Sequence, residues 1–219
     1  MFINPHTHTD RSNIRGFLDS TNRIEDLLDY SKELGHKGIC ITDHDNVSVH
    51  ITALNRFKAL KDPNSEIYTK EGRIYNENDW KEYKLVLGNE IYLCSKKDII
   101  EENNYKFYHF ILLAKDKIGH QQIRELSTRA WTDNSFTWVN IRTPTYYEDL
   151  FEVVEQNRGH LIASTACLGG KLPNLILEAY NKNSMSPNLE MCKKWLKRID
   201  KCFGHGNFFL EMQPSNQEE

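Results

Sequence analysis

The sequence lacks long hydrophobic runs, paired-cysteine motifs and a large excess of charge of either sign. No apolar run reaches membrane-spanning length, and no cationic segment with an apolar signal core opens the chain, so we expect a cytoplasmic protein without a membrane partner. The net charge of −3 indicates no overall affinity for nucleic acid, which restricts any DNA contact to a local surface. The five cysteines form no Cys-x-x-Cys pair and are odd in number, which argues against a secreted disulfide framework.

The length of 219 residues suits one domain with a substantial core. Apolar, β-branched runs alternate with segments of helical apolar spacing, a pattern that predicts an α/β domain on a parallel sheet. A polar segment at about 62–84 is expected to be a surface insertion with room for a small hairpin. Six strands are expected at about 2–8, 37–43, 85–93, 107–114, 160–165 and 208–212, and helices at about 24–34, 48–61, 119–131, 146–157, 172–182 and 189–202.

The first helix has the clearest end signals. Asn22 and Glu25 have the spacing of a capping pair, and Gly35 follows the last apolar residue of the helical pattern. Further along the chain, turn residues at 183–188 predict a loop between the last two helices.

Two histidines end the first expected strand. His6 and His8 are two residues apart, and residues i and i+2 of a strand point to the same face, so both imidazoles can reach one metal ion. Taken alone, the pair fits surface or structural histidines equally well. The remaining candidates decide between these readings.

Further metal-binding residue types fall at or near the ends of the later strands, where α/β barrels gather their active sites. Nitrogen, carboxylate and thiolate donors together favour zinc, manganese or iron over calcium or magnesium. Glu90 stands out, because a carboxylate inside an apolar strand needs a partner or a metal. The candidates beyond the histidine pair are Asp19, His44, Glu90, His109 and Cys167.

Each candidate also has a structural explanation. Asp43 and His44 fit an ordinary strand-end turn, and His109 fits a core histidine with satisfied hydrogen bonds. Cys167 fits a small buried hydrophobic residue, the usual role of a free cysteine. Their joint occurrence on successive strand ends is what favours a metal site.

Several short segments, spread in order along nearly the whole chain, resemble a known family. They are His6-Thr-His-Thr-Asp10, Leu18-Asp19, Ile41-Thr-Asp-His44, Gly88-Asn-Glu90, Tyr108-His-Phe-Ile-Leu-Leu-Ala-Lys115 and Leu161-Ile-Ala-Ser-Thr-Ala-Cys-Leu-Gly-Gly170. Together they resemble the polymerase-and-histidinol-phosphatase (PHP) domain at the N-terminus of the DNA polymerase III alpha subunit of bacteria and its phage relatives. The last segment distinguishes the polymerase branch from the free-standing phosphatases.

The resemblance implies a PHP-type (βα)7 barrel with up to three zinc or manganese ions at its mouth. The matching ligand positions are His6, His8, Asp19, His44, Glu90, His109 and Cys167. The family's final Asp-x-His strand has no counterpart here, so we expect an incomplete barrel that lacks its last strand. Its exposed edges predict poor stability alone, or association with the remainder of the polymerase chain or a complementing C-terminal fragment. DNA and other replisome subunits would then be partners through the parent protein.

The activity implied by the resemblance is metal-assisted phosphoester hydrolysis, either as a proofreading 3′–5′ exonuclease or as a pyrophosphatase. We expect Glu90 to bridge two metals and to act with His8 and His44 as the catalytic set. Two alternatives remain open: a free-standing phosphatase acting on a small phosphate monoester, and a non-catalytic structural module of a polymerase.

Asp45 stands where relatives usually have glycine, and either a metal-binding or a turn role suits it. A basic run at 193–201 is expected to be a solvated helix face.

Overall fold

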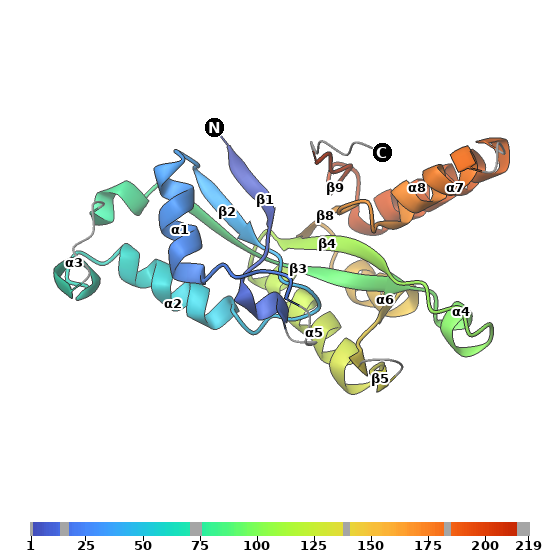
Figure 1. Cartoon of the computed structure of the whole chain (residues 1–219), viewed down its shortest axis with the longest axis horizontal. Coiled ribbons are helices and arrows are strands. Elements are labelled where there is room, and N and C mark those ends of the chain that lie inside the picture. The colour runs from blue at the N-terminus through green and yellow to red at the C-terminus, as the bar shows by residue number, and fades with distance from the viewer. Residues whose placement is uncertain (1, 14–17, 71–75, 138–140, 182–184, 214–219) are drawn as a thin grey trace.

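The computed structural model describes residues 2–13, 18–70, 76–137, 141–181 and 185–213. These residues form a mixed α/β domain around one open, curled sheet in which strands are hydrogen-bonded in the order β1-β2-β3-β4-β8-β9, with β7 paired to β3 (Figure 1). The six predicted strands are confirmed, and in this part of the chain the sheet ends at β1 on one edge and at β9 on the other. The strands are β1 Ile3–Thr7, β2 Gly38–Ile41, β3 Lys84–Cys94, β4 Tyr108–Ala114, β7 Thr145–Tyr146, β8 Leu161–Ser164 and β9 Phe208–Phe209.

The prediction of a fully parallel sheet was wrong. β1, β2 and β3 are parallel, but β4 runs antiparallel to both β3 and β8. Between β3 and β4 the chain forms only the short helix α4 (Lys96–Ile100), which packs at the end of β3 and does not carry the chain back along the sheet. If β4 were parallel to β3, the chain would have to cross back along the whole sheet between them. The first residues of β4 therefore lie beside the last residues of β3.

Within the described ranges, six longer helices cover this sheet, in agreement with the predicted pattern. Figure 1 shows α1 and α2 beside the β1–β2 end, and the α7–α8 pair at the other end of the molecule. Helix α8 begins at Met185, so part of the loop expected at 183–188 is helical, while 182–184 lie outside the described residues. The helices are α1 Ile24–Glu33, α2 His50–Leu60, α5 Lys117–Thr132, α6 Tyr147–Gln156, α7 Lys171–Asn181 and α8 Met185–Phe203.

The start of α1 differs from the predicted capping pair. The cap position is Arg23, which makes no side-chain cap hydrogen bond. Asn22 instead donates from Nδ2 to the His8 carbonyl oxygen over 3.3 Å. The end is as predicted, because Gly35 has φ +75°, a left-handed conformation that suits glycine.

The segment 62–84 contains helix α3 (Ile67–Lys70) and the 3-10 helix η2 (Glu77–Trp80), and its described residues before β3 contain no hairpin. Its C-terminal part reaches the core, because Trp80 and Tyr83 are buried in the cluster under α1 and α2.

A second and larger cluster packs α5, α6 and α8 against β3, β4 and β8. Two-residue strands β5 (Phe136–Thr137) and β6 (Ile141–Arg142) are too short for a sequence pattern to predict. None of the helices in the described ranges is long and apolar enough to span a membrane.

Candidate metal centre

Strand β1 brings the two N-terminal histidines together as predicted. His6 is the fourth of its five residues, and His8 follows its end. Their Nε2 atoms lie 2.9 Å apart. Both atoms also face one carboxylate oxygen, Glu90 Oε2, at 3.0 Å from His6 and 2.9 Å from His8.

Glu90 lies at the centre of the cluster, inside β3, with only 1% of its surface exposed. Its second oxygen, Oε1, lies 2.8 Å from His109 Nδ1, and His44 Nδ1 lies 3.3 Å from Oε2. Burial raises the pKa of the Glu90 carboxyl, but contacts with His109, His6 and His8 outweigh it and hold the pKa well below its usual range. Four imidazoles therefore surround one ionised carboxylate.

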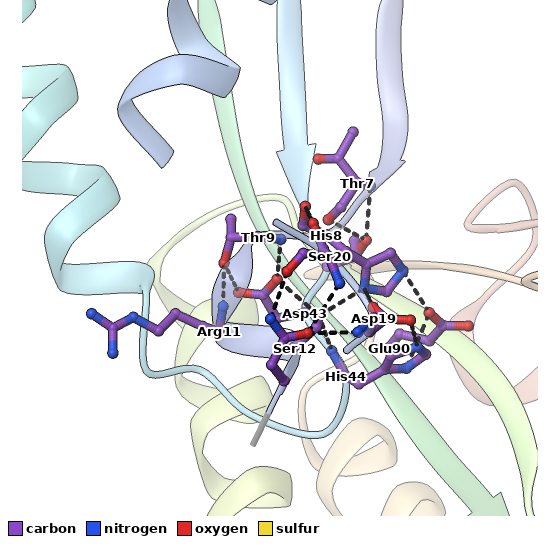
Figure 2. Close-up of polar contacts among 12 residues, drawn as sticks. Thr7, His8, Thr9, Arg11, Ser12, Asp19, Ser20, Asp43, His44 and Glu90 are labelled. Atoms are coloured by element: carbon purple, nitrogen blue, oxygen red, sulfur yellow. Dashed lines mark hydrogen bonds and ion pairs between the residues drawn. The ribbon is translucent and has the colours of Figure 1, made fainter. Parts of the chain in front are cut away.

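Asp19 extends the cluster toward solvent. Its carboxylate oxygens lie 3.6 Å from His44 Nε2 and 3.6 Å from His8 Nδ1 (Figure 2). The resulting candidate ligands form three overlapping groups, in each of which the ligand atoms lie within 4.8 Å of one another. The groups are His6 with His8 and Glu90, His8 with Asp19 and His44, and His44 with Glu90 and His109.

His109 reaches the cluster because β4 is reversed. It is the second residue of β4, and in an antiparallel neighbour the beginning of the strand lies beside the end of β3. Cys167, in the turn after β8, lies 3.4 Å from His109 Nδ1 through its Sγ and accepts the Gly169 N–H. Burial raises the pKa of the Cys167 thiol, but these two contacts outweigh it and lower the pKa. Cys167 thus borders the third group without belonging to it.

The hydrogen bonds around the cluster show that it suits a cation. Ser12 Oγ donates to Asp43 Oδ1 over 3.1 Å, so it can only accept from His8 Nδ1, 2.9 Å away (Figure 2). This leaves a lone pair on His8 Nε2, which faces the carboxylate of Glu90. His44 Nδ1 is buried and has no hydrogen-bond partner among the described residues. Acceptors thus converge without a donor between them, as at a site for a positive ion.

Without a metal ion, a proton on His6 can lie between these acceptor atoms. Burial lowers the pKa of His6, but Glu211 and Glu90 outweigh it and raise the pKa to about 10. Burial lowers the pKa of His44 to about 4, so this ring is neutral at pH 7 and ready to bind a metal. The donor set of imidazole, carboxylate and thiolate suits zinc or manganese.

Asp45 does not face this cluster. It has φ +56°, a left-handed conformation that glycine adopts with less strain than aspartate. Its carboxylate accepts a hydrogen bond from the Thr143 hydroxyl, and its carbonyl oxygen accepts one from Trp131 Nε1. Asp45 therefore fixes the turn after β2.

Sequence patterns missed several residues around the candidate ligands. Tyr92 stacks on His44 with ring centroids 5.6 Å apart and meets His109 edge-on at 5.1 Å. Tyr92 lies two residues after Glu90 in a strand, which places both side chains on one face, so this spacing could have predicted that Tyr92 lies beside the candidate ligands. Ser12 and Glu211 each contact the outer nitrogen of a histidine, and no sequence pattern marks either contact.

A cavity of about 450 Å³ opens beside the histidine pair. Its lining includes His6, His8 and Asp19 of the cluster together with Asn22, Tyr30 and His36. The cavity is large enough for a small phosphate-containing ligand next to the candidate ligands.

The family model described as "PHP domain" matches residues 4–215. The chain belongs to the PHP domain family. The match spans the part of the chain that carries all the candidate ligands, from His6 to Cys167.

Curated relatives of this PHP chain are DNA polymerases. It is 36% identical over 227 residues to the DNA-directed DNA polymerase of Bacillus phage SPbeta, covering 99% of this chain and 16% of that protein. It is 27% identical over 226 residues to DNA polymerase III subunit alpha of Aquifex aeolicus, covering 100% of this chain and 16% of that protein. It is 25% identical over 221 residues to DNA polymerase III subunit alpha of Treponema pallidum, covering 100% of this chain and 15% of that protein. The chain thus spans about a sixth of the length of the relatives it matches.

Proposed function

We propose that this PHP domain is a metal-dependent phosphoesterase within the N-terminal part of a replicative DNA polymerase III alpha subunit. The observation that supports this best is the convergence of His6 Nε2, His8 Nε2 and Glu90 Oε2 within 3.0 Å of one another. Three acceptor atoms at such distances repel one another unless a proton or a metal cation lies between them, and a metal cation can be shared by all three.

Zinc or manganese ions, up to three, are the proposed cofactors. When bound, they supply an activated water and neutralise charge on phosphoryl oxygens. The residues that would hold them are His6, His8, Asp19, His44, Glu90, His109 and Cys167.

Glu90 is the proposed bridging carboxylate, because its two oxygens face different groups of candidate ligands. Oε2 faces His6 and His8, while Oε1 faces His109. His8 belongs to two of the three groups and His44 also belongs to two, so each ring could serve two neighbouring ions. We therefore assign Glu90, His8 and His44 as the catalytic set.

The proposed substrates are a DNA 3′ end or pyrophosphate. The polymerase relatives support both, since one activity removes misincorporated nucleotides and the other removes the by-product of synthesis. Partners in this proposal are the remainder of the polymerase chain, or a complementing C-terminal fragment, together with DNA and other replisome subunits. The proposed location is the cytoplasm, where replication takes place in bacteria. The free-standing monoester phosphatase and the non-catalytic module are outcomes of the same test.

The test measures bound metal by elemental analysis, followed by hydrolysis of a labelled oligonucleotide, pyrophosphate and p-nitrophenyl phosphate. Each assay is run with and without the C-terminal part of the parent polymerase. Glu90→Gln should abolish both metal uptake and hydrolysis, while Glu190→Gln, an exposed glutamate on α8, should change neither. Hydrolysis of the monoester alone would indicate a phosphatase. Protein with neither metal nor activity would leave only the structural module.

A further inference from the structure

We propose that Glu211 is a positioning residue of this centre, which holds His6 in the orientation and tautomer that present Nε2 to a metal. This inference rests on the proposed metal centre, and no sequence pattern pointed to Glu211. The contact that carries it joins His6 Nδ1 and Glu211 Oε1 over 2.6 Å. The other ring nitrogen, Nε2, faces the carboxylate of Glu90.

The carboxylate of Glu211 is itself held from several sides. Ser164 Oγ donates to Oε2 over 2.6 Å, and Gln213 Nε2 donates to Oε1 over 2.9 Å. The backbone N–H of Glu211 donates to Thr165 Oγ1 over 3.0 Å. Only 8% of the side chain is exposed. A carboxylate fixed by such donors is a rigid acceptor, so His6 would keep its hydrogen on Nδ1 when a metal replaces the hydrogen on Nε2.

His8, the neighbouring candidate ligand, is held in the same way by other residues. His8 Nδ1 contacts Ser12 Oγ over 2.9 Å, and Ser12 in turn donates to Asp43. In each case the outer nitrogen is bonded away from the cluster and the inner nitrogen faces Glu90. Outer partners of this kind fix the tautomer of a metal-bound histidine and increase its basicity.

Glu211 also connects the two edges of the open sheet. It follows β9, the last strand of the described sheet, and His6 belongs to β1, the first. The two residues are 205 positions apart in the chain. The orientation of His6 thus depends on β9 being in place, which couples the metal centre to the packing of the last described strand.

The test compares Glu211→Ala and Glu211→Gln with the wild-type full chain, using Zn²⁺ alone as the probe. Zinc affinity is measured by competition with a chromophoric chelator. Loss of an outer partner of a ligating histidine typically weakens metal binding 10- to 100-fold, and we expect about this loss for the alanine variant. The glutamine variant keeps an acceptor of the same shape and should lose less. Glu190→Ala and Glu190→Gln are matched controls, because Glu190 pairs with Lys193 on the exposed face of α8.

A second readout separates positioning from general stabilisation. In the zinc-bound wild type, ¹⁵N NMR should show His6 with a hydrogen on Nδ1 and zinc on Nε2. The alanine variant should lose this single pattern while the circular dichroism spectrum of the folded chain is retained. If both Glu211 variants bind zinc as tightly as wild type with an unchanged His6 spectrum, the positioning role is wrong although the metal centre stands. If the wild type binds no zinc, the proposed function and this inference both fail.

Discussion

His109 Nδ1 lies 2.8 Å from Glu90 Oε1, across the antiparallel pair of β3 and β4. Glu90 is paired with Ile111 and His109 with Tyr92, so the two residues are diagonal neighbours on one face of the sheet. Diagonal partners on an antiparallel pair are within reach of long side chains. The reversed strand therefore places an imidazole beside the buried carboxylate.

We propose that Cys167 contributes to metal preference, since its Sγ lies 3.4 Å from the same nitrogen of His109. We expect Cys167→Ser to reduce the preference for Zn²⁺ over Mn²⁺ by at least about 10-fold, because thiolate is the softest donor in the set. Competition binding with the two ions measures the ratio. Cys192→Ala, which changes a buried cysteine of α8, is the control and should leave the ratio unchanged. Equal ratios in Cys167→Ser and wild type would exclude Cys167 as a ligand.

Stability should depend on pH through His50, away from the cluster. His50 Nε2 donates to the Gly88 carbonyl oxygen over 2.9 Å, and His120 Nε2 lies 3.1 Å from His50 Nδ1. Burial lowers the pKa of His50 to about 4. The unfolded chain therefore binds the extra proton between pH 6.5 and about 4, so this stabilisation is complete above pH 6.5 and is lost as pH falls toward 4.

The loss should be on the order of 3 kcal/mol at the acidic end of that window. Urea unfolding of wild type and His50→Gln from pH 4 to 7 measures it, and the variant should show a shallower decrease toward low pH. His205→Gln is the control, because the His205 side chain is 97% exposed. Parallel pH curves for His50→Gln and wild type would contradict this assignment.

Asp45→Gly should leave metal binding unchanged. The substitution removes the hydrogen bond from Thr143 but relieves a left-handed conformation that costs an L-residue roughly 1–2 kcal/mol. The free energy of unfolding should therefore change by less than about 1.5 kcal/mol. Urea unfolding and zinc competition measure the two effects. A large loss of zinc affinity in this variant would show that Asp45 acts on the metal centre.

The parts of the site that depend on local geometry were predictable from the sequence. The spacing of His6 and His8 alone placed both rings on one strand face, and the apolar run around Glu90 indicated a buried carboxylate that needs partners. Strand positions were also predictable, because long apolar segments mark them. These signals come from residues close together in the chain.

Strand direction was not predictable in the same way. The reversal of β4 depends on how α4 packs at the end of β3, and no periodicity in either strand reports it. The Glu211–His6 contact spans 205 positions and depends on the tertiary packing of β9. The cap of α1 was mispredicted for a similar reason, since Asn22 is engaged by the loop that carries His8. Tertiary contacts outweighed the local preference in each case.

Anomalous diffraction from crystals of the chain grown with Zn²⁺ or Mn²⁺ tests the metal centre most directly. We predict an anomalous peak about 2.0–2.2 Å from His6 Nε2, His8 Nε2 and a Glu90 oxygen, with further peaks beside His44 and His109. Crystals in which the ion binds elsewhere, or in which these side chains keep their contacts without an anomalous peak between them, would contradict the account.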